Sequence, residues 1–277
     1  MPELPEVEHA RQLIEQTAKG YRIIEVGCAS DSVVLEGVTA AEIRQALRNR
    51  IVCAARRRGK HIWLELDKRP WPCFHLGMTG AFHTANTSPI KLVTSHVVEE
   101  KQWPPRFTKL HLTLSNESEL VMTNKRRLGR IRLRQDPTGE PPISQLGFDP
   151  LLDLPSLEKF SEWLTGRSGA IKSLLLDQSF AAGVGNWIAD EVLYQAKISP
   201  KRPTHQLSKS EIKIIRLRLR HIIETAVQAN ADASKFPKTW LFHRRWNKNA
   251  NSELAGHSIE FITVGGRTTA WVPELQR

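Results

Sequence analysis

The sequence predicts an α+β protein: an N-terminal β-sandwich flanked by a helix, followed by a helical half that ends in a β-hairpin. Apolar residues recur at helical spacing over residues 5–19, then alternate with polar residues to about residue 134, and later return to helical spacing. Turn sequences rich in proline and glycine interrupt the pattern between the two halves. We therefore expect domains at 1–135 and 156–277, joined by a linker at 136–155.

The first predicted helix, residues 5–19, ends at Gly20. Its apolar stripe consists of Val7, Ala10, Ile14 and Ala18. The strands that follow are short and are separated by turn-rich breaks; the clearest are 61–66, 109–114 and 130–134, with breaks at 67–72 and 115–118. Many short antiparallel strands of this kind are typical of a sandwich or a barrel.

The clearest helix of the second half begins after Ser208, which forms a capping box with Glu211. Its buried stripe is Ile212, Ile215, Leu219, Ile222, Ile223 and Ala226, and Lys209, Lys213, Arg216 and Arg220 lie off it on what is typically a solvated face. Near the C-terminus, residues 258–264 and 267–272 are rich in β-formers. They flank a Gly-Gly pair, a strong signal for a hairpin because the favoured two-residue turns need positive φ.

The composition excludes several classes of protein. No segment approaches the roughly 20 apolar residues that cross a bilayer, and the acidic N-terminus does not resemble a signal peptide. We therefore expect an intracellular protein with no membrane partner. The 40 Lys and Arg residues exceed the 29 Asp and Glu residues, for a net charge of +11. This charge favours a polyanionic partner, although a basic protein without one would look the same.

The cysteines give no sign of a metal centre. Cys28, Cys53 and Cys73 are odd in number and widely spaced, without a Cys-x-x-Cys pair. The ten histidines include no His-x-x-x-His pair. We predict no metal and no cofactor.

The N-terminus is the first candidate for chemistry. Removal of Met1 would expose Pro2 as a secondary amine with a pKa near neutrality, roughly 8, and an amine that attacks a sugar carbon can form a Schiff base. Glu3 beside it suits a general acid or base. Taken alone, however, the same residues also fit a proline and acidic residues that favour the start of a helix.

Two further segments suit contact with nucleic acid. Glycines in residues 183–186 (GVGN) precede a helix, where backbone N–H groups and the Asn186 side chain can approach a phosphate; a tight turn between helices is the alternative. Residues 124–129 (NKRRLG) form a basic loop with an apolar tip, which suits phosphate contacts and a wedge between bases. An ordinary charged hairpin would have the same composition.

Together these segments resemble the formamidopyrimidine-DNA glycosylase and endonuclease VIII family, over essentially the whole chain and in the family's order. The resemblance rests on residues 2–8 (PELPEVE), on Arg58-Gly-Lys60 before a strand, and on residues 75–80 (HLGMTG) as an intercalation loop. It continues through residues 171–178 (IKSLLLDQ) and GVGN, which resemble the family's helix–two-turns–helix. Residues 265–268 (GGRT) resemble the tip of its finger.

The resemblance implies a bifunctional DNA glycosylase and abasic-site lyase of base excision repair, acting as a monomer on damaged double-stranded DNA held in a basic cleft between two domains. It implies Pro2 as the Schiff-base nucleophile, Glu3 as the acid or base, and Lys60 as a phosphate contact that assists catalysis. The other implied DNA contacts are Asn186, Arg267, Lys172 and Arg126, and the implied intercalating residues are Met78, Arg126 and Leu128. A eukaryotic source would imply a nuclear enzyme.

Two departures from the family matter. Bacterial members usually carry a four-cysteine zinc finger, whereas residues 257–272 resemble the zincless finger of plant and fungal relatives. Leu128 stands where formamidopyrimidine glycosylases usually have Phe, so its wedge is shorter.

Two alternative functions would use the same basic residues: a non-catalytic nucleic-acid-binding protein and a ribosome-associated RNA protein. Both alternatives predict that blocking the N-terminus would leave the function of the protein unchanged.

Overall fold

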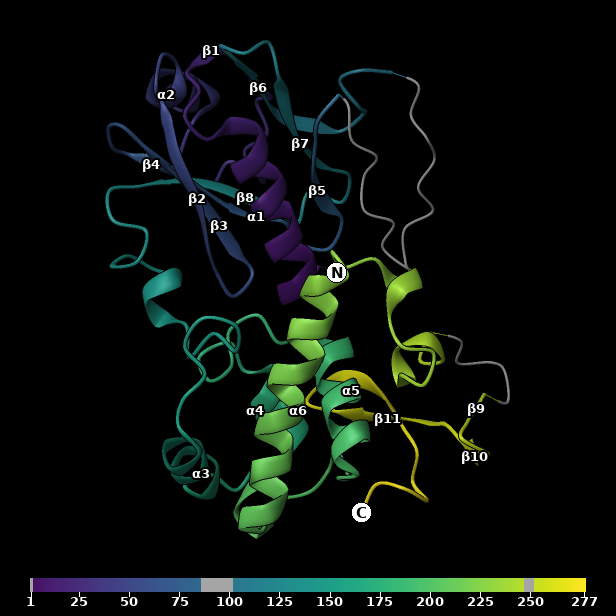
Figure 1. The fold of residues 1–277 in the computed structure, drawn as a ribbon. Helices are drawn as coiled ribbons and strands as arrows, with labels where there is room; N and C mark the ends of the chain where they lie inside the picture. The colour runs from purple at the N-terminus through teal and green to yellow at the C-terminus, as the bar shows by residue number, and fades with distance from the viewer. Residues whose placement is uncertain (1, 86–101, 247–251) are drawn as a thin grey trace. The chain divides into compact units, whose positions relative to one another are not determined.

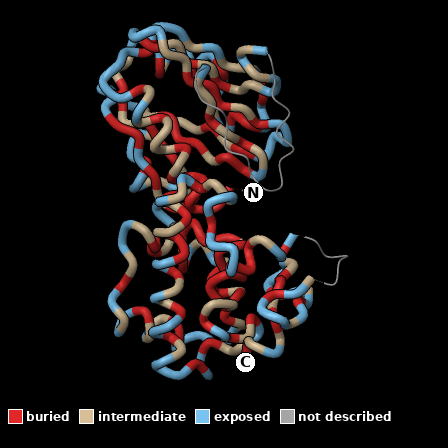
Figure 2. The backbone as a smooth tube through the Cα atoms, turned by 45° about the vertical axis from the view of Figure 1, so that its right-hand side comes forward, coloured by how far each residue is buried: buried red, intermediate tan, exposed pale blue. Residues whose placement is uncertain are grey.

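The computed structural model describes residues 2–85, 102–246 and 252–277 and divides the chain into two compact units (Figure 1). Unit 1 comprises Met1–Gln145 with Asn230–Ala233, and unit 2 comprises Leu146–Ala229 with Ser234–Arg277. The division after Gln145 falls inside the segment 136–155 that was expected to be a linker. In each unit, buried residues occur along the strands and helices between exposed ones (Figure 2).

Unit 1 is a sandwich of two four-stranded antiparallel sheets, as the period-two pattern predicted. One sheet has the order β1-β6-β7-β5 and the other β2-β3-β4-β8. The strands of the first sheet are β1 (Ile23–Cys28), β5 (Gly80–His83), β6 (Thr108–Leu114) and β7 (Glu119–Asn124). Those of the second are β2 (Val52–Arg58), β3 (His61–Leu66), β4 (Trp71–His75) and β8 (Arg130–Arg134).

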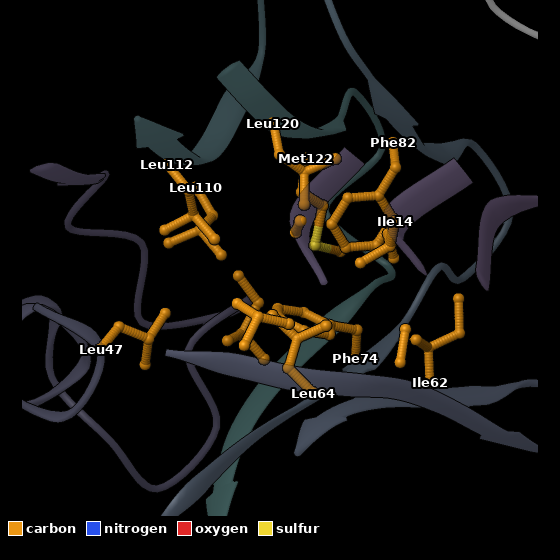
Figure 3. Packing of buried hydrophobic residues seen from close by; sticks show 14 of the residues in the cluster. Ile14, Leu47, Ile62, Leu64, Phe74, Phe82, Leu110, Leu112, Leu120 and Met122 are labelled. Atoms are coloured by element: carbon orange, nitrogen blue, oxygen red, sulfur yellow. The ribbon is translucent and has the colours of Figure 1, made fainter. Parts of the chain in front are cut away.

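The core of unit 1 lies between the two sheets (Figure 3). Its side chains come from both inner faces, and Phe74 of β4 meets Phe82 of β5 edge to face, with ring centroids 5.2 Å apart. Helix α1 (Leu4–Ala18) packs against β2, β5 and β7, and the stripe predicted from its sequence is buried. The first residues of the chain are thus held on the sandwich.

Besides residues 29–51, which lead from β1 to β2, two short loops cross from one sheet to the other. Residues 76–79 lead from β4 to β5, and residues 125–129 lead from β7 to β8. The strands that flank the second loop belong to different sheets, so it is not the simple charged hairpin that its composition also fits. The two crossing loops contact each other, as described below.

Unit 2 contains four α-helices and two hairpins among its described residues. The helices are α3 (Leu157–Thr165), α4 (Ile171–Leu176), α5 (Asn186–Ala196) and α6 (Lys209–Gln228). Helix α6 begins with the predicted capping box of Ser208 and Glu211. The strands are β9 (Glu253–Leu254), β10 (His257–Ser258), β11 (Glu260–Val264) and β12 (Arg267–Trp271). Strands β11 and β12 pair around Gly265 and Gly266, as their sequence predicted, and β12 packs against α5.

The sequence pattern was misread at two places. Helix α2 (Ala40–Leu47) interrupts the strands, because Thr39 and Glu42 form a capping box ahead of a segment of good helix formers. Strand β4 starts at Trp71, inside a stretch that was read as a turn. Within the described part of the chain, no helix is long and apolar enough to cross a membrane.

Candidate active site and nucleic-acid interface

Pro2 and Glu3 lie buried at the N-terminal end of α1. Glu6, one turn into the helix, accepts a hydrogen bond from the backbone N–H of Glu3 at 3.0 Å. Burial, and secondarily the charge of Glu3, raise the pKa of Glu6 to about 7. Two carboxyl groups therefore stand at the N-terminal end of α1, and burial favours the protonated form of Glu6.

Lys60 lies in the two-residue turn between β2 and β3 and is 9% exposed. The buried Arg57 braces this turn, since its Nη1 donates to the Gly59 carbonyl at 3.0 Å. Nε of Arg57 also lies 2.8 Å from Oε2 of Glu8 in α1. One buried ion pair thus fixes the lysine turn to the helix that carries Pro2 and Glu3.

Two histidines of β3 and β4 lie near Lys60. His61 and His75 face each other with ring centroids 4.9 Å apart. Burial above all lowers the pKa of His61 to about 3 and that of His75 to about 4, and the charge of Lys60 adds to both effects. Both rings are therefore neutral at physiological pH, and Nδ1 of His75 accepts the backbone N–H of Gly77 at 3.2 Å.

The two crossing loops are joined by hydrogen bonds. Asn124 is fully buried; its Nδ2 donates to the Leu76 carbonyl at 3.0 Å, and its Oδ1 accepts the N–H of Gly129 at 3.2 Å. The N–H of Arg126 donates to Oγ1 of Thr79 at 3.2 Å. These bonds hold residues 76–79 and 125–129 side by side.

The apolar residues predicted to intercalate are exposed on these loops: Met78 is 37% exposed and Leu128 is 43% exposed. Gly77 lets the loops approach, because a Cβ there would come within 2.4 Å of the Leu128 carbonyl carbon. Arg126 is exposed on the same loop. The structure thus brings the three predicted residues onto one pair of joined loops.

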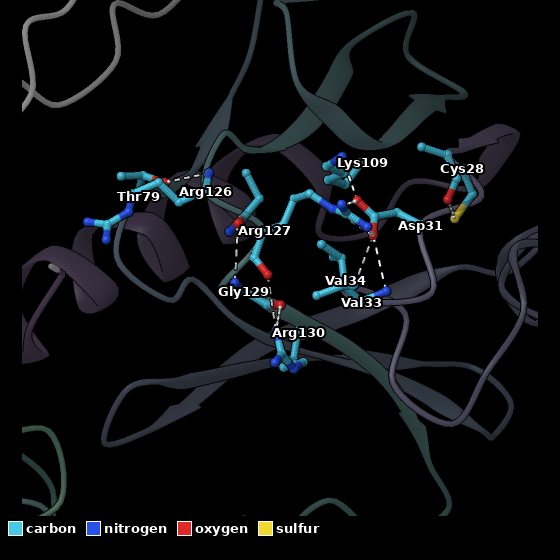
Figure 4. Close-up of polar contacts among 12 residues, drawn as sticks. Cys28, Asp31, Val33, Val34, Thr79, Lys109, Arg126, Arg127, Gly129 and Arg130 are labelled. Carbon is cyan, nitrogen blue, oxygen red and sulfur yellow. Dashed lines mark hydrogen bonds and ion pairs between the residues drawn. The ribbon is translucent and has the colours of Figure 1, made fainter.

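Asp31 anchors the basic loop through Arg127 (Figure 4). Its Oδ1 and Oδ2 accept from Nη2 and Nε of Arg127, both at 2.9 Å, and Nζ of Lys109 lies 2.8 Å from Oδ2. Hydrogen bonds from Arg127 above all hold the pKa of Asp31 well below its usual range. Arg127 has a positive φ of 54°, a conformation that this two-point contact stabilises.

The GVGN segment forms a tight turn before α5. The Gln178 side chain closes it: Nε2 donates to the carbonyl of Val184 at 2.8 Å, and Oε1 accepts the N–H of Gly183 at 3.0 Å. Gly183 has a φ of 91°, which favours glycine. Asn186, the first residue of α5, donates from Nδ2 to the carbonyl of Thr268 at 2.8 Å.

Arg267 and Lys172 differ sharply in exposure. Arg267 is exposed at the start of β12, beside the Gly-Gly turn. Lys172 was expected to contact DNA, but it is fully buried, with Nζ 2.6 Å from Oδ1 of Asp190 and 2.6 Å from Oγ1 of Thr269. The expectation for Lys172 therefore needs correction: its charge is directed into the protein, towards Asp190.

Sequence reasoning missed the acidic residues that hold these basic side chains. Asp31, Glu8 and Asp190 are buried carboxylates that pair with basic residues distant in sequence. Only Asp190 had a visible signal, since it lies with Glu191 between Ala189 and Val192 in a largely apolar helix, where buried acids need partners. The other partners are 49 and 96 residues away, and no local pattern reveals them.

The described residues include no group of three or more His, Cys, Asp or Glu side chains placed to hold a metal ion. The hairpin in particular does not suit zinc. Residues 260–271 contain no cysteine or histidine, and no cysteine follows Cys73 in the chain.

Three family models match the chain in sequence. Residues 1–131 match the formamidopyrimidine-DNA glycosylase N-terminal domain, residues 146–238 its H2TH domain, and residues 240–273 the formamidopyrimidine-DNA glycosylase-like C-terminal domain. H2TH denotes the helix–two-turns–helix, which here is formed by α4, the turn closed by Gln178, and α5.

Curated relatives and solved structures agree with these matches. The chain is 43% identical over 277 residues to a formamidopyrimidine-DNA glycosylase of Arabidopsis thaliana, covering all of this chain and 71% of that protein. A bacterial relative from Pelotomaculum thermopropionicum is 29% identical over 291 residues, covering 100% of this chain and 99% of its own. The Lactococcus lactis enzyme bound to DNA with an abasic site has a TM-score of 0.81 and 25% identity, with 99% of each chain covered.

Proposed function

The chain belongs to the formamidopyrimidine-DNA glycosylase family, and from that premise we propose which of its residues perform the chemistry. It is a DNA glycosylase of base excision repair with the abasic-site lyase activity typical of the family. The observation that carries the assignment of residues is the buried N-terminal end of α1, tied through Glu8 and Arg57 to the turn that holds Lys60.

Pro2 is the proposed nucleophile. Once Met1 is removed, the Pro2 nitrogen attacks C1′ of the damaged nucleotide; the N–C1′ bond forms as the glycosidic bond breaks and the base leaves with a proton. Sugar ring opening, with Glu3 as proton donor, gives an iminium between Pro2 and the sugar. Loss of a proton from C2′ then expels the 3′ phosphate, and a second elimination expels the 5′ phosphate. The free amine returns once the sugar fragment is released by water.

The remaining residues have proposed roles in holding DNA. The cations of Lys60, Arg126 and Arg267 contact phosphates, and Asn186 supports this grip at the H2TH turn. The target nucleotide is flipped out, because C1′ cannot be reached inside the duplex. Met78, Leu128 and Arg126 fill the space that it leaves. In this division, residues 1–135 carry the catalytic groups and residues 156–277 grip the strand.

The proposed substrates are formamidopyrimidines, hydantoins and abasic sites, with 8-oxoguanine a weaker one. Residues 231–246 stand where bacterial relatives have a longer, glycine-containing loop that closes over 8-oxoguanine; here this segment contains two short 3-10 helices, Ala233–Lys235 and Leu241–His243. Phe236, Trp240 and Phe242 pack around Trp187 of α5, with ring centroids 5.8, 6.4 and 5.1 Å from it. A DNA repair enzyme of this kind is intracellular, and for a eukaryotic source we propose the nucleus.

Borohydride trapping tests the nucleophile. Borohydride reduces the iminium to a stable amine, so an active enzyme becomes covalently attached to oxidised duplex DNA. A tag left on the N-terminus turns the Pro2 nitrogen into an amide and should abolish trapping, as should Pro2→Gly, while DNA binding persists. The same tag placed at the C-terminus is the control and should leave trapping intact.

Two outcomes would contradict these assignments. Full trapping with a blocked N-terminus would exclude Pro2 as the nucleophile. Absence of trapping by the protein with a free N-terminal proline, verified by mass spectrometry, would favour the non-catalytic nucleic-acid-binding alternative.

A further inference from the structure

The carboxylate of Asp190 in α5 is buried between two cations. Its Oδ1 lies 2.6 Å from Nζ of Lys172 in α4, and its Oδ2 lies 2.8 Å from Nη2 of Arg245. The side chains of Lys172 and Asp190 are fully shielded from solvent, and that of Arg245 is 6% exposed. Charges removed from water in this way carry a large desolvation penalty, so each depends on its partners.

The same groups hold strand β12. The N–H of Ala270 donates to Oδ2 of Asp190 at 3.1 Å. Nζ of Lys172 donates to Oγ1 of Thr269 at 2.6 Å and points to the carbonyl of Thr268 at 3.4 Å. Three successive residues of the hairpin are therefore fixed to α4 and α5 by buried side chains.

Arg267 directly precedes this fixed segment. Oγ1 of Thr269, the group that Lys172 contacts, also donates to the carbonyl of Arg267 at 3.3 Å. On the other side of Arg267, the turn rests against α4, because a Cβ on Gly265 would lie 2.8 Å from Oγ and 3.3 Å from Cα of Ser173. The exposed guanidinium thus projects from a backbone that is held on both sides.

In a finger with four cysteines, a bound metal ion would hold the backbone of the finger in place. This hairpin lacks such ligands. We propose that Asp190 is a positioning residue for DNA binding: through Lys172, Arg245 and the N–H of Ala270, it fixes the hairpin so that Arg267 meets a phosphate. The inference rests on the proposed function of Arg267 as a DNA contact.

The test is a double-mutant cycle on binding to a duplex that contains a tetrahydrofuran analogue of an abasic site. Kd is measured over a series of salt concentrations for wild type, Asp190→Asn, Arg267→Ala and the double variant. Loss of one phosphate contact should weaken binding roughly tenfold and reduce the slope of log Kd against log salt by about 0.9. If Asp190 acts through Arg267, both single variants show this change and the double variant is no worse.

Glu191→Gln is the matched control. Glu191 is the next residue in α5 and is also buried, but it accepts its described hydrogen bonds from Nε2 of Gln195 and the N–H of Phe242. It should leave Kd and the salt slope unchanged. The rate at saturating enzyme on a preformed abasic site should stay within about twofold of wild type for Asp190→Asn, because only binding is altered.

A second pair of variants covers the case in which Asp190→Asn does not fold. Thr269→Val keeps the shape of the side chain but removes the hydroxyl that meets Lys172, and Thr269→Ser restores it. Thr269→Val should therefore show the weaker binding and the shallower salt slope expected of Asp190→Asn. Thr269→Ser, which keeps the hydroxyl, should match wild type in both.

The possible results separate the two claims. Additive losses in the double-mutant cycle, or equal binding by Thr269→Val and Thr269→Ser, would overturn the role of Asp190 while Arg267 remains a DNA contact. An unchanged salt slope for Arg267→Ala would overturn both that contact and the inference built on it. The borohydride assay, which depends on Pro2, would still report the chemical step.

Discussion

Glu6 makes stability depend on pH at the scale of a single residue. Its pKa is raised from 4.5 to about 7, so the folded protein binds this proton more tightly than the unfolded chain does. The stabilisation is fully present below pH 4.5 and is lost as the pH rises through 7. Glu6→Gln mimics the protonated group and keeps an acceptor for the N–H of Glu3. By pH 8.5 it should therefore gain stability relative to wild type by up to about 3 kcal/mol.

Urea unfolding of wild type and Glu6→Gln at pH 5, 7 and 8.5 checks this prediction. The comparison isolates Glu6, since Glu191, whose pKa burial above all raises to about 7, titrates in both proteins. A difference in the free energy of unfolding that stays constant over this range would show that Glu6 does not titrate there.

Single residues also mark where sequence reasoning stopped. Pro2, Glu3, Lys60 and Arg267 lie in short local motifs, so their proposed roles were legible from the sequence. The carboxylates that position basic residues were not, because a pair such as Asp31 and Arg127 is created only when distant strands come together. Lys172 shows the opposite error: a basic residue in a DNA-binding motif was read as a DNA contact, although its partner lies inside the protein.

At the scale of elements, the contact between Asp31 and Arg127 should decide how well the intercalation loop holds its shape. In the wild-type protein the guanidinium of Arg127 contacts both carboxylate oxygens of Asp31. Asp31→Asn removes the negative charge and leaves only one oxygen to accept from Arg127. Since Arg127 is half exposed, overall stability should fall by only about 1 kcal/mol. We expect the altered loop to place Leu128 and Arg126 poorly against the base opposite the lesion.

A fluorescent 2-aminopurine placed opposite an abasic analogue measures this placement. In complex with Asp31→Asn, its fluorescence should differ from that in the wild-type complex, and discrimination between opposite bases should weaken. Glu65→Gln is the control, because Glu65 of β3 pairs with Arg56 of β2. Identical fluorescence with wild type and Asp31→Asn would show that the loop does not need this anchor.

Elements with strong local signals were predicted well. The capping box before α6 and the Gly-Gly hairpin appear as expected, and β3 and β8 have the predicted bounds. Helix α2 was overlooked because it is only eight residues long and lies among strands. Which sheet each strand joins was not predictable, since pairing joins segments that are far apart in the sequence.

At the scale of the whole molecule, the lesion preference follows from what the enzyme uses to hold a flipped base. A planar base such as 8-oxoguanine differs little from guanine and requires specific hydrogen bonds to be told apart. Ring-opened or non-planar bases stack poorly and flip at lower cost. Single-turnover rates on matched duplexes should therefore be higher for formamidopyrimidines and hydantoins than for 8-oxoguanine. An 8-oxoguanine rate equal to or above the hydantoin rate would mean that the segment 231–246 does not limit recognition.

The contacts that anchor the loop also have a consequence for folding. Asp31 and Arg127 are 96 residues apart, and Asn124 reaches back 48 residues to Leu76. Contacts of such long sequence separation slow folding, because distant segments of the chain must first be brought together. A partly folded chain has the same net charge of +11 and would bind DNA nonspecifically through that charge. It would lack the ordered loops whose side chains insert between bases. The proposed insertion of Met78 and Leu128 into the duplex therefore requires the completed fold of unit 1.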